Sequence, residues 1–251
     1  MATENSYWKA FSAFRNRDNY KEVFPTTLSK LSSELNMTSV KLCVTFGPGD
    51  GQYEIQFIKQ CAVNTSKIIA VELDHESVQR LRARLEKSLP GVESQVIEAN
   101  IQSWKGLDDP VDLVLMMHVL YDFGPKERKE LFKKLHEQWL AEGGRLIVVH
   151  ASRTKCPGSP YKVFERVGTT LTEWEDIEVD LLDAGFIQQH VHEMQYTRDF
   201  SNPDEHILRF YQHYAAQPVT LDDVRSVIEE LFPGGKLGEA FYTCAVFQNA
   251  Q

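Results

Sequence analysis

The sequence contains few cysteines, and no pattern groups them at a metal. Its 251 residues include four cysteines, and no two are spaced as C-x-x-C, the usual arrangement of a zinc-binding turn. Three of them, Cys43, Cys61 and Cys244, stand among apolar residues. We therefore expect no metal site and interpret these three as small buried side chains.

Long apolar runs and an excess of basic residues are also missing. Without a run of 18 apolar residues, no membrane-spanning helix is expected. The formal net charge of −9 disfavours nonspecific attraction to nucleic acid or to an anionic membrane. The first residues have neither the basic nor the apolar segment of a secretion signal, and no apolar stripe indicates oligomerisation. We expect a cytoplasmic monomer whose partner is neither nucleic acid nor a membrane.

The most informative segment that is present contains three glycines. A short apolar run over 43–46 leads into Gly47, Gly49 and Gly51, and a segment with helical spacing follows. Glycine adopts positive φ at little cost and lets a ligand approach the backbone closely, and a helix N-terminus presents free N–H groups. Because an ordinary turn can have the same pattern, the context decides its meaning.

Four more apolar runs follow, and polar residues end three of them. The second run ends in Glu72, at about the 20-residue distance at which doubly wound folds place a ribose-binding acid. The third ends in Asn100 and the fourth in His118, and the fifth, 146–149, follows a Gly-Gly turn. Helical segments separate the runs, which predicts a doubly wound α/β fold with a mostly parallel sheet. Ligands of such sheets bind at the carboxyl ends of the strands, so Gly47 and these three polar residues are expected at one site.

The glycine spacing distinguishes two classes of ligand. A dinucleotide binder has G-x-G-x-x-G, but the third position of that motif is Gln52 here. Asp50 within the loop would repel a pyrophosphate and would tolerate a ligand that carries an ammonium and a sulfonium group. The loop therefore favours S-adenosylmethionine.

Over residues 40–250 the sequence resembles the class I S-adenosylmethionine-dependent methyltransferases. The resemblance rests on the glycine loop, on Glu72 and Asn100, on the Gly143-Gly144 turn and on two further strands near the C-terminus. It implies a doubly wound, seven-stranded, mostly parallel sheet, the Rossmann-like methyltransferase fold, with N-terminal helices and a small C-terminal or inserted lid.

The expected domain organisation follows from this resemblance. Residues 1–38 would form a helical cap and residues 39–251 a methyltransferase domain. Insertions at about 151–180 and 196–236 would supply a lid over the substrate.

The family pattern also implies contacts with the cofactor. Glu72 would bind the ribose hydroxyls, Asn100 the adenine amino group, and Ile101 would pack on the adenine ring. His118 and Val119 would lie beside the transferred methyl group. Three residues would form the loop under the methionine part of S-adenosylmethionine: Gly47, Gly49 and Gly51.

Within this class, the closer resemblance is to the histamine N-methyltransferase family, over most of the chain. It is carried by Phe14-Arg15-Asn16 in an aromatic N-terminal helix, by Leu120-Tyr121 after the fourth strand, and by aromatic residues at Phe164 and Phe241. It implies a pocket for a small acceptor, formed by five aromatic residues: Phe14, Tyr20, Tyr121, Phe164 and Tyr242. The aromatic residues of the N-terminal helix could equally serve only to dock that helix on the core.

Two of that family's histamine contacts are not matched. Its glutamine after the fourth strand is His118 here, and Asp18 and Glu22 lie only near the place of its N-terminal acid, which Tyr20 could also occupy. We therefore predict N-methylation of a small biogenic amine or imidazole compound rather than of histamine itself. A [D/N]-P-P-[Y/F] motif after the fourth strand, typical of nucleobase methylation, is absent.

Methyl transfer from a sulfonium needs an aligned, uncharged nitrogen and an acceptor for its proton. His118 is the candidate base, with Tyr121 and Asp122 as its helpers. The alternative for His118 is a hydrogen bond to the backbone or to the cofactor carboxylate, and Tyr121 could equally be a core aromatic residue. His190 and His192 share one strand face, but without a third ligand we expect surface or packing roles for them.

Two other functions remain open. The acceptor could be a protein or another macromolecule docked on the inserted segments. The chain could also bind S-adenosylmethionine without catalysing transfer.

Overall fold

The computed structural model describes residues 4–250, which form two compact units. The first, the aromatic unit, contains the chain up to Phe24 together with Ala151–Glu173 and Met194–Tyr242. The second, the sheet unit, contains Pro25–His150, Trp174–Glu193 and the chain from Thr243 onward.

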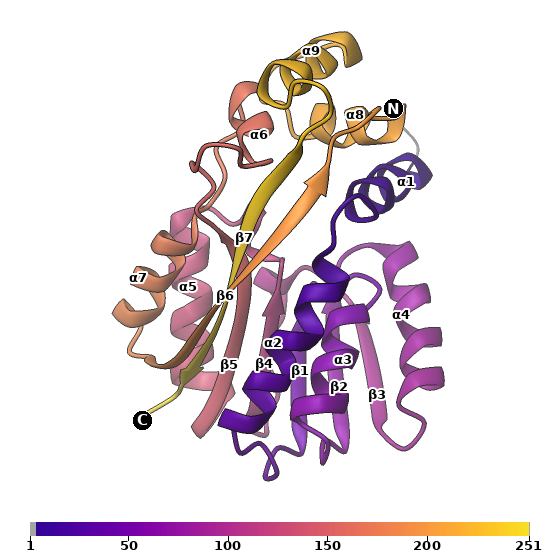
Figure 1. Cartoon of the computed structure of the whole chain (residues 1–251). Coiled ribbons are helices and arrows are strands. Elements are labelled where there is room, and N and C mark those ends of the chain that lie inside the picture. Colours follow the sequence, from indigo (N-terminus) through magenta and orange to yellow (C-terminus); the bar gives the residue numbers. More distant parts are fainter. Residues whose placement is uncertain (1–3, 251) are drawn as a thin grey trace. The chain divides into compact units, whose positions relative to one another are not determined.

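The sheet unit is built on a seven-stranded, mostly parallel sheet (Figure 1). The strand order is β3-β2-β1-β4-β5-β7-β6, and the pairs β1–β2, β2–β3, β1–β4 and β4–β5 are parallel. The last residues of β5 and parts of β6 and β7 belong to the aromatic unit. The strands are β1 (Leu42–Phe46), β2 (Lys67–Glu72), β3 (Glu93–Glu98), β4 (Val111–Met117), β5 (Leu140–Ser152), β6 (Ile187–Asp199) and β7 (Leu237–Gln248).

Burial along the strands follows their place in the sheet. β4 lies between β1 and β5, and all of its residues except Asp112 are buried. β3 lies at one edge and has no fully buried residue. A central parallel strand is covered on both faces and is therefore apolar throughout, which explains the uninterrupted apolar run at 113–117.

The helices between the strands bury one face each. In α4, Asp74 caps the N-terminus by accepting the N–H of Ser77 at 2.7 Å. Three apolar residues of this helix are buried: Val78, Leu81 and Leu85. The helical elements that lie wholly in this unit are α3 (Gln52–Cys61), α4 (His75–Ser88), η1 (Ile101–Ser103), η2 (Leu120–Asp122), α5 (Pro125–Lys134), η3 (Leu135–Trp139) and α7 (Trp174–Asp183).

A buried ion pair joins two of these helices. The Arg128 guanidinium on α5 donates through Nε to Asp180 Oδ2 on α7 at 2.6 Å, and Arg128 and Asp180 are only 3% and 5% exposed. This pair holds α5 against α7, which lie side by side in Figure 1.

The aromatic unit contains four helices of its own and parts of three strands. Its helices are α1 (Glu4–Arg15), α6 (Lys162–Arg166), α8 (Glu205–His213) and α9 (Leu221–Leu231). α1 packs along α8, and α9 contacts both α8 and α6. α2 (Tyr20–Glu34) begins in this unit and continues into the sheet unit, and the division falls at Pro25 inside the helix. Proline removes one helical hydrogen bond, so the helix is locally weakest where the units divide.

The fold predicted from the sequence is confirmed. All seven expected strands are present, and β4 has the predicted limits. One local expectation is wrong: Leu140 to Gly144 was expected as a helix end and a turn before a strand at Leu146, but β5 already begins at Leu140. The three cysteines expected to be buried are buried. Among the described helices, none is both long enough and apolar enough to cross a bilayer. The division at residue 38 remains a prediction.

Candidate active site

The glycine loop lies where the strand order reverses, between β1 and β4, which is the usual ligand position in such sheets. Gly47, Gly49 and Gly51 all have positive φ, at 56°, 59° and 73°. A Cβ atom on Gly47 would lie 2.3 Å from Val119 Cγ2, and one on Gly51 would lie 2.3 Å from Leu81 Cδ1. The loop thus requires glycine for its conformation and for its close contacts with η2 and α4.

Glu72 ends β2 beside this loop and is only 8% exposed. Its Oε2 accepts the N–H of Gly49 at 2.8 Å, and its Oε1 accepts those of Leu73 and Asp74 at 2.8 and 2.9 Å. A carboxylate has about four acceptor positions, so one remains available once these three amides are bound. The amides fix the carboxylate at the tip of β2 and leave capacity for a hydroxyl group.

Asn100 and Ile101 follow β3. The Asn100 carbonyl oxygen accepts the N–H of Gln102 at 2.8 Å and caps η1. Ile101 is buried, and its Cδ1 lies 3.9 Å from the position that a Cβ on Gly47 would occupy. Ile101 therefore lies next to the loop, as expected. The side-chain oxygen of Asn100, Oδ1, already accepts one hydrogen bond from the backbone. The contacts of both with adenine remain predictions.

His118 directly follows β4 and has a strained backbone. Its φ is 60°, in the left-handed region that side chains other than glycine rarely adopt. Such a conformation costs about 1–2 kcal/mol. The His118 N–H donates to Val149 O at 2.9 Å on β5, which helps to hold the turn. This turn places Val119 against Gly47.

Two imidazoles and two phenols gather at this end of the sheet unit. His118 Nδ1 lies 3.3 Å from the Tyr121 hydroxyl, and the Tyr121 ring centroid is 4.2 Å from that of His150. Tyr53 on α3 is edge-on to His118 at 6.1 Å. The structure thus brings the two predicted catalytic residues together and adds His150 and Tyr53. In the sequence, His150 directly follows the apolar run 146–149, as His118 follows the fourth run, and this position was the available signal.

The charge of Asp50 is partly neutralised. Arg84 on α4 forms an ion pair with it, with Nη2 2.8 Å from Oδ2. The repulsion of a pyrophosphate that the sequence suggested is therefore weaker than expected. The glycine spacing remains the stronger argument against a dinucleotide.

Four of the five predicted acceptor-binding residues lie together in the aromatic unit. Phe14 and Phe164 are 6.1 Å apart, and Tyr20 and Tyr242 are 4.8 Å apart, measured between ring centroids. Tyr161 connects the two pairs, with its ring 6.1 Å from Phe164 and 6.5 Å from Tyr242. These four residues and Tyr161 are all buried. The remaining predicted residue, Tyr121, belongs to the sheet unit.

A buried arginine within this cluster was not predicted. Arg198 is 1% exposed, its Cζ lies 3.6 Å from the Phe14 ring centroid, and its Nη2 donates to Asp18 Oδ2 at 2.8 Å. Burial alone would lower the pKa of Arg198, but Tyr196 and Asp18 raise that pKa well above its usual value. No spacing in the sequence connects Arg198 with Asp18, and the two meet because β6 continues to Asp199.

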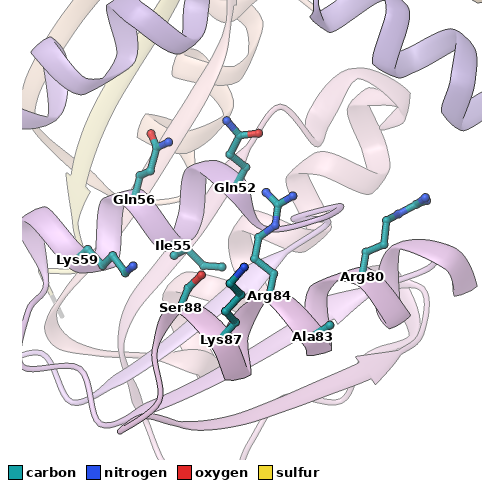
Figure 2. A pocket seen from close by; sticks show the side chains of 9 residues that line it. All are labelled: Gln52, Ile55, Gln56, Lys59, Arg80, Ala83, Arg84, Lys87 and Ser88. Atoms are coloured by element: carbon teal, nitrogen blue, oxygen red, sulfur yellow. The ribbon is translucent and has the colours of Figure 1, made fainter.

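A surface hollow of about 580 Å³ lies between α3 and α4 (Figure 2). Basic side chains surround it, among them Lys59, Arg84 and Lys87. None of the predicted cofactor or acceptor residues lines it. We therefore do not place the predicted chemistry there.

Comparisons with known proteins agree with this geometry. Residues 44–144 match a family described as a methyltransferase domain, and this range includes every residue predicted to contact the cofactor. No curated protein matches the chain.

Solved structures with the same fold are methyltransferases of several kinds. A putative methyltransferase from Bacillus halodurans is 14% identical with a TM-score of 0.65, covering 90% of this chain and 100% of its own. The N-methyltransferase NodS from Bradyrhizobium japonicum, bound to S-adenosyl-L-homocysteine, is 14% identical with a TM-score of 0.60, covering 99% and 100%. Geranyl diphosphate C-methyltransferase from Streptomyces coelicolor is 15% identical with a TM-score of 0.55, covering 89% and 77%.

The chain has the class I methyltransferase fold, and residues 44–144 match a methyltransferase domain, whose cofactor is S-adenosylmethionine. The residues present fit this cofactor. The loop has the positive φ angles that only glycine adopts freely, and Glu72 is an acceptor fixed beside it at the tip of β2. When bound, S-adenosylmethionine supplies an activated sulfonium methyl group.

Proposed function

We propose that the chain transfers this methyl group to a nitrogen of a small amine or imidazole compound. The observation that carries the proposal is the group formed by His118, Tyr121 and His150 at the ends of β4 and β5. It lies beside Val119, which packs against the glycine loop. An ionisable side chain is thus held next to the part of the loop that we assign to the methionine end of the cofactor.

The chemistry requires the acceptor nitrogen to be uncharged when it attacks. An imidazole is the side chain best suited to take up this proton near neutral pH. Since the Tyr121 hydroxyl contacts His118 Nδ1, we assign Nε2 of the same ring to the acceptor. Tyr121 then orients the imidazole ring, and the strained backbone at His118 fixes the point from which this side chain extends.

The aromatic unit does not select the charge of the acceptor. Asp18 lies near the place expected for the N-terminal acid of the histamine N-methyltransferase family, but it is buried against Arg198. The carboxylate and the guanidinium balance each other, so this pair offers neither an anion for an ammonium group nor a cation for a carboxylate. The acceptors to be tested therefore include both amines and carboxylated imidazoles.

The structural relatives do not decide between acceptors. One is an N-methyltransferase and another is a C-methyltransferase of geranyl diphosphate, and identities of 14–15% concern the fold alone. The open alternatives are a macromolecular acceptor and a chain that binds the cofactor without turnover.

A turnover assay with methyl-labelled S-adenosylmethionine tests the proposal. The panel pairs histamine with histidine and adds other biogenic amines, imidazoles and histidine-containing dipeptides. We expect a labelled small product and at least a tenfold lower rate in His118→Gln. His75→Gln is the matched control, because His75 is an exposed histidine paired with Glu98.

Each other outcome has a meaning. Label found only in protein or nucleic acid would favour the macromolecular acceptor. Cofactor binding without any labelled product would favour the inactive relative. A His118→Gln variant as active as the parent chain would refute the assignment of the base.

A further inference from the structure

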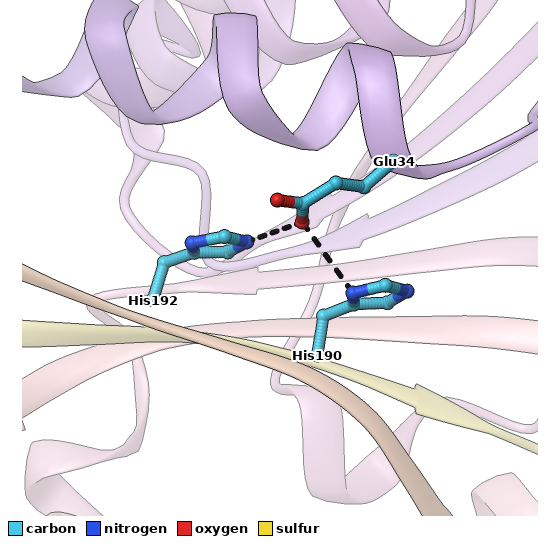
Figure 3. Close-up of side chains that lie close together, drawn as sticks. All are labelled: Glu34, His190 and His192. Atoms are coloured by element: carbon cyan, nitrogen blue, oxygen red, sulfur yellow. Dashed lines mark hydrogen bonds and ion pairs between the residues drawn. The ribbon is translucent and has the colours of Figure 1, made fainter.

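We propose that Glu34, His190 and His192 form a zinc-binding site in the sheet unit (Figure 3). The sequence showed only the two histidines on one face of a strand. The fold supplies the third ligand from the last residue of α2, which is far away in the sequence. This site lies outside the residues assigned to methyl transfer and does not depend on that assignment.

The three side chains converge on one point. His192 Nε2 lies 2.7 Å and His190 Nδ1 lies 3.4 Å from the same oxygen, Glu34 Oε2. All three ligand atoms lie within 4.8 Å of one another. In Figure 3 both imidazoles extend from β6 toward α2, and the Glu34 carboxylate extends toward them.

These separations are close to those of a metal-bound state. Metal–ligand bonds of about 2.0–2.1 Å at tetrahedral angles place the ligand atoms about 3.3 Å apart. The contact with His190 already has this length, and the contact with His192 must lengthen by about 0.6 Å for the same geometry. Glu34 can make this movement, because its side chain is 38% exposed and ends a helix.

The ligand set selects the kind of metal. Two imidazole nitrogens and one carboxylate oxygen suit Zn²⁺, whereas Ca²⁺ and Mg²⁺ prefer oxygen ligands alone. Three protein ligands leave a fourth position, which water can fill because the site is half-exposed.

The helix end gives an independent reason for a cation here. The C-terminus of a helix carries partial negative charge and disfavours a carboxylate. Glu34 is the last residue of α2, and the last turn of this helix contains no basic residue. A divalent cation would balance both the carboxylate and the helix end, and it would tie α2 to β6, the edge strand of the sheet.

Metal titration of the full chain tests this site. The protein is first treated with a chelator, and Zn²⁺ binding is then measured by calorimetry together with the melting temperature. We expect one Zn²⁺ per chain at this site and a higher melting temperature, with no such effect of Mg²⁺ or Ca²⁺. His192→Asn and Glu34→Gln should each weaken Zn²⁺ binding at least tenfold. His75→Asn should leave it unchanged, because His75 and Glu98 form a similar exposed pair without a second histidine.

Co²⁺ provides a second readout that needs no variant. In the parent chain it should give the visible absorption of a tetrahedral site, and Zn²⁺ should displace it. The absence of this spectrum, or Zn²⁺ binding that is unchanged in folded His192→Asn, would overturn the proposal. If His192→Asn does not fold, the Co²⁺ spectrum of the parent chain decides.

Discussion

Removing the Glu72 carboxylate is the most direct test of the cofactor site. In Glu72→Ala both oxygens are lost, while Glu72→Gln keeps the shape and one acceptor oxygen. Three backbone amides now donate to this carboxylate, from Gly49, Leu73 and Asp74. Either change therefore affects the glycine loop as well as the proposed contact with ribose.

The magnitude follows from the kind of hydrogen bond involved. A hydrogen bond to a charged group contributes about 1.5–3 kcal/mol. Loss of one such bond to a ribose hydroxyl predicts S-adenosylmethionine binding weaker by about ten- to a hundredfold. Glu72→Gln should also lower the free energy of unfolding of the cofactor-free protein. Both oxygens of Glu72 accept backbone N–H groups, and the glutamine NH₂ would replace one of these acceptors with a donor.

Calorimetric titration with S-adenosylmethionine, together with denaturant unfolding of the free protein, separates the two effects. Glu98→Ala is the control, since Glu98 pairs with Glu72 in the β2–β3 register but has an exposed partner in His75. It should bind the cofactor like the parent chain. Unchanged affinity in folded Glu72→Ala would show that this carboxylate does not hold the ribose.

Three further results are expected. Gly51→Ala should lower the free energy of unfolding by about 1–3 kcal/mol, because residue 51 has positive φ and its Cβ would enter the space of Leu81. Gly91→Ala is the control, because a Cβ there would meet open space. Equal unfolding curves for the two variants would contradict this prediction. Asp18→Asn should destabilise the chain by about 3–5 kcal/mol, because it leaves the charge of Arg198 buried without its partner. Glu230→Gln is the control, because Glu230 forms an exposed ion pair with Arg166. An equal loss of stability in the two variants would argue against a stabilising buried ion pair. Burial raises the pKa of Tyr211 to about 12, above its unfolded value of about 10. The folded chain therefore holds this proton more tightly, and its free energy of unfolding should fall as the pH rises from about 10 to 12. Tyr211→Phe should reduce this pH dependence, and an unchanged dependence would refute the contribution of Tyr211.

The fold could be predicted because its signals are local. Each strand of the parallel core is a short apolar run, and each helix between them has an apolar face, as in Val78, Leu81 and Leu85 of α4. The start of β5 was predicted wrongly because Gly143 and Gly144 signal a turn by themselves. In the sheet, Leu140 pairs with Val111 and Arg145 with Leu113, so strand pairing extends across the glycines through a register shift.

The candidate site was predictable where it depends on chain order and less so where it depends on distant contacts. The positions of Gly47, Glu72 and His118 at strand ends follow from the sequence of elements alone. The ion pair of Asp18 with Arg198 and the approach of Glu34 to the two histidines join residues far apart in the chain. No spacing rule connects such residues, and only the folded chain brings them together.

His118 and Arg198 each break a local rule of protein structure. A histidine at positive φ and a guanidinium buried among aromatic rings each cost free energy that packing elsewhere must offset. Glycine at 118 would adopt this φ freely, and an apolar residue at 198 would need no buried partner, so stability alone does not explain either residue. His118 stands where the proposed reaction needs a base, and Arg198 lies among the aromatic residues predicted to bind the acceptor. Local rules are broken most often at functional sites, which makes these two residues the first to examine when the acceptor is sought.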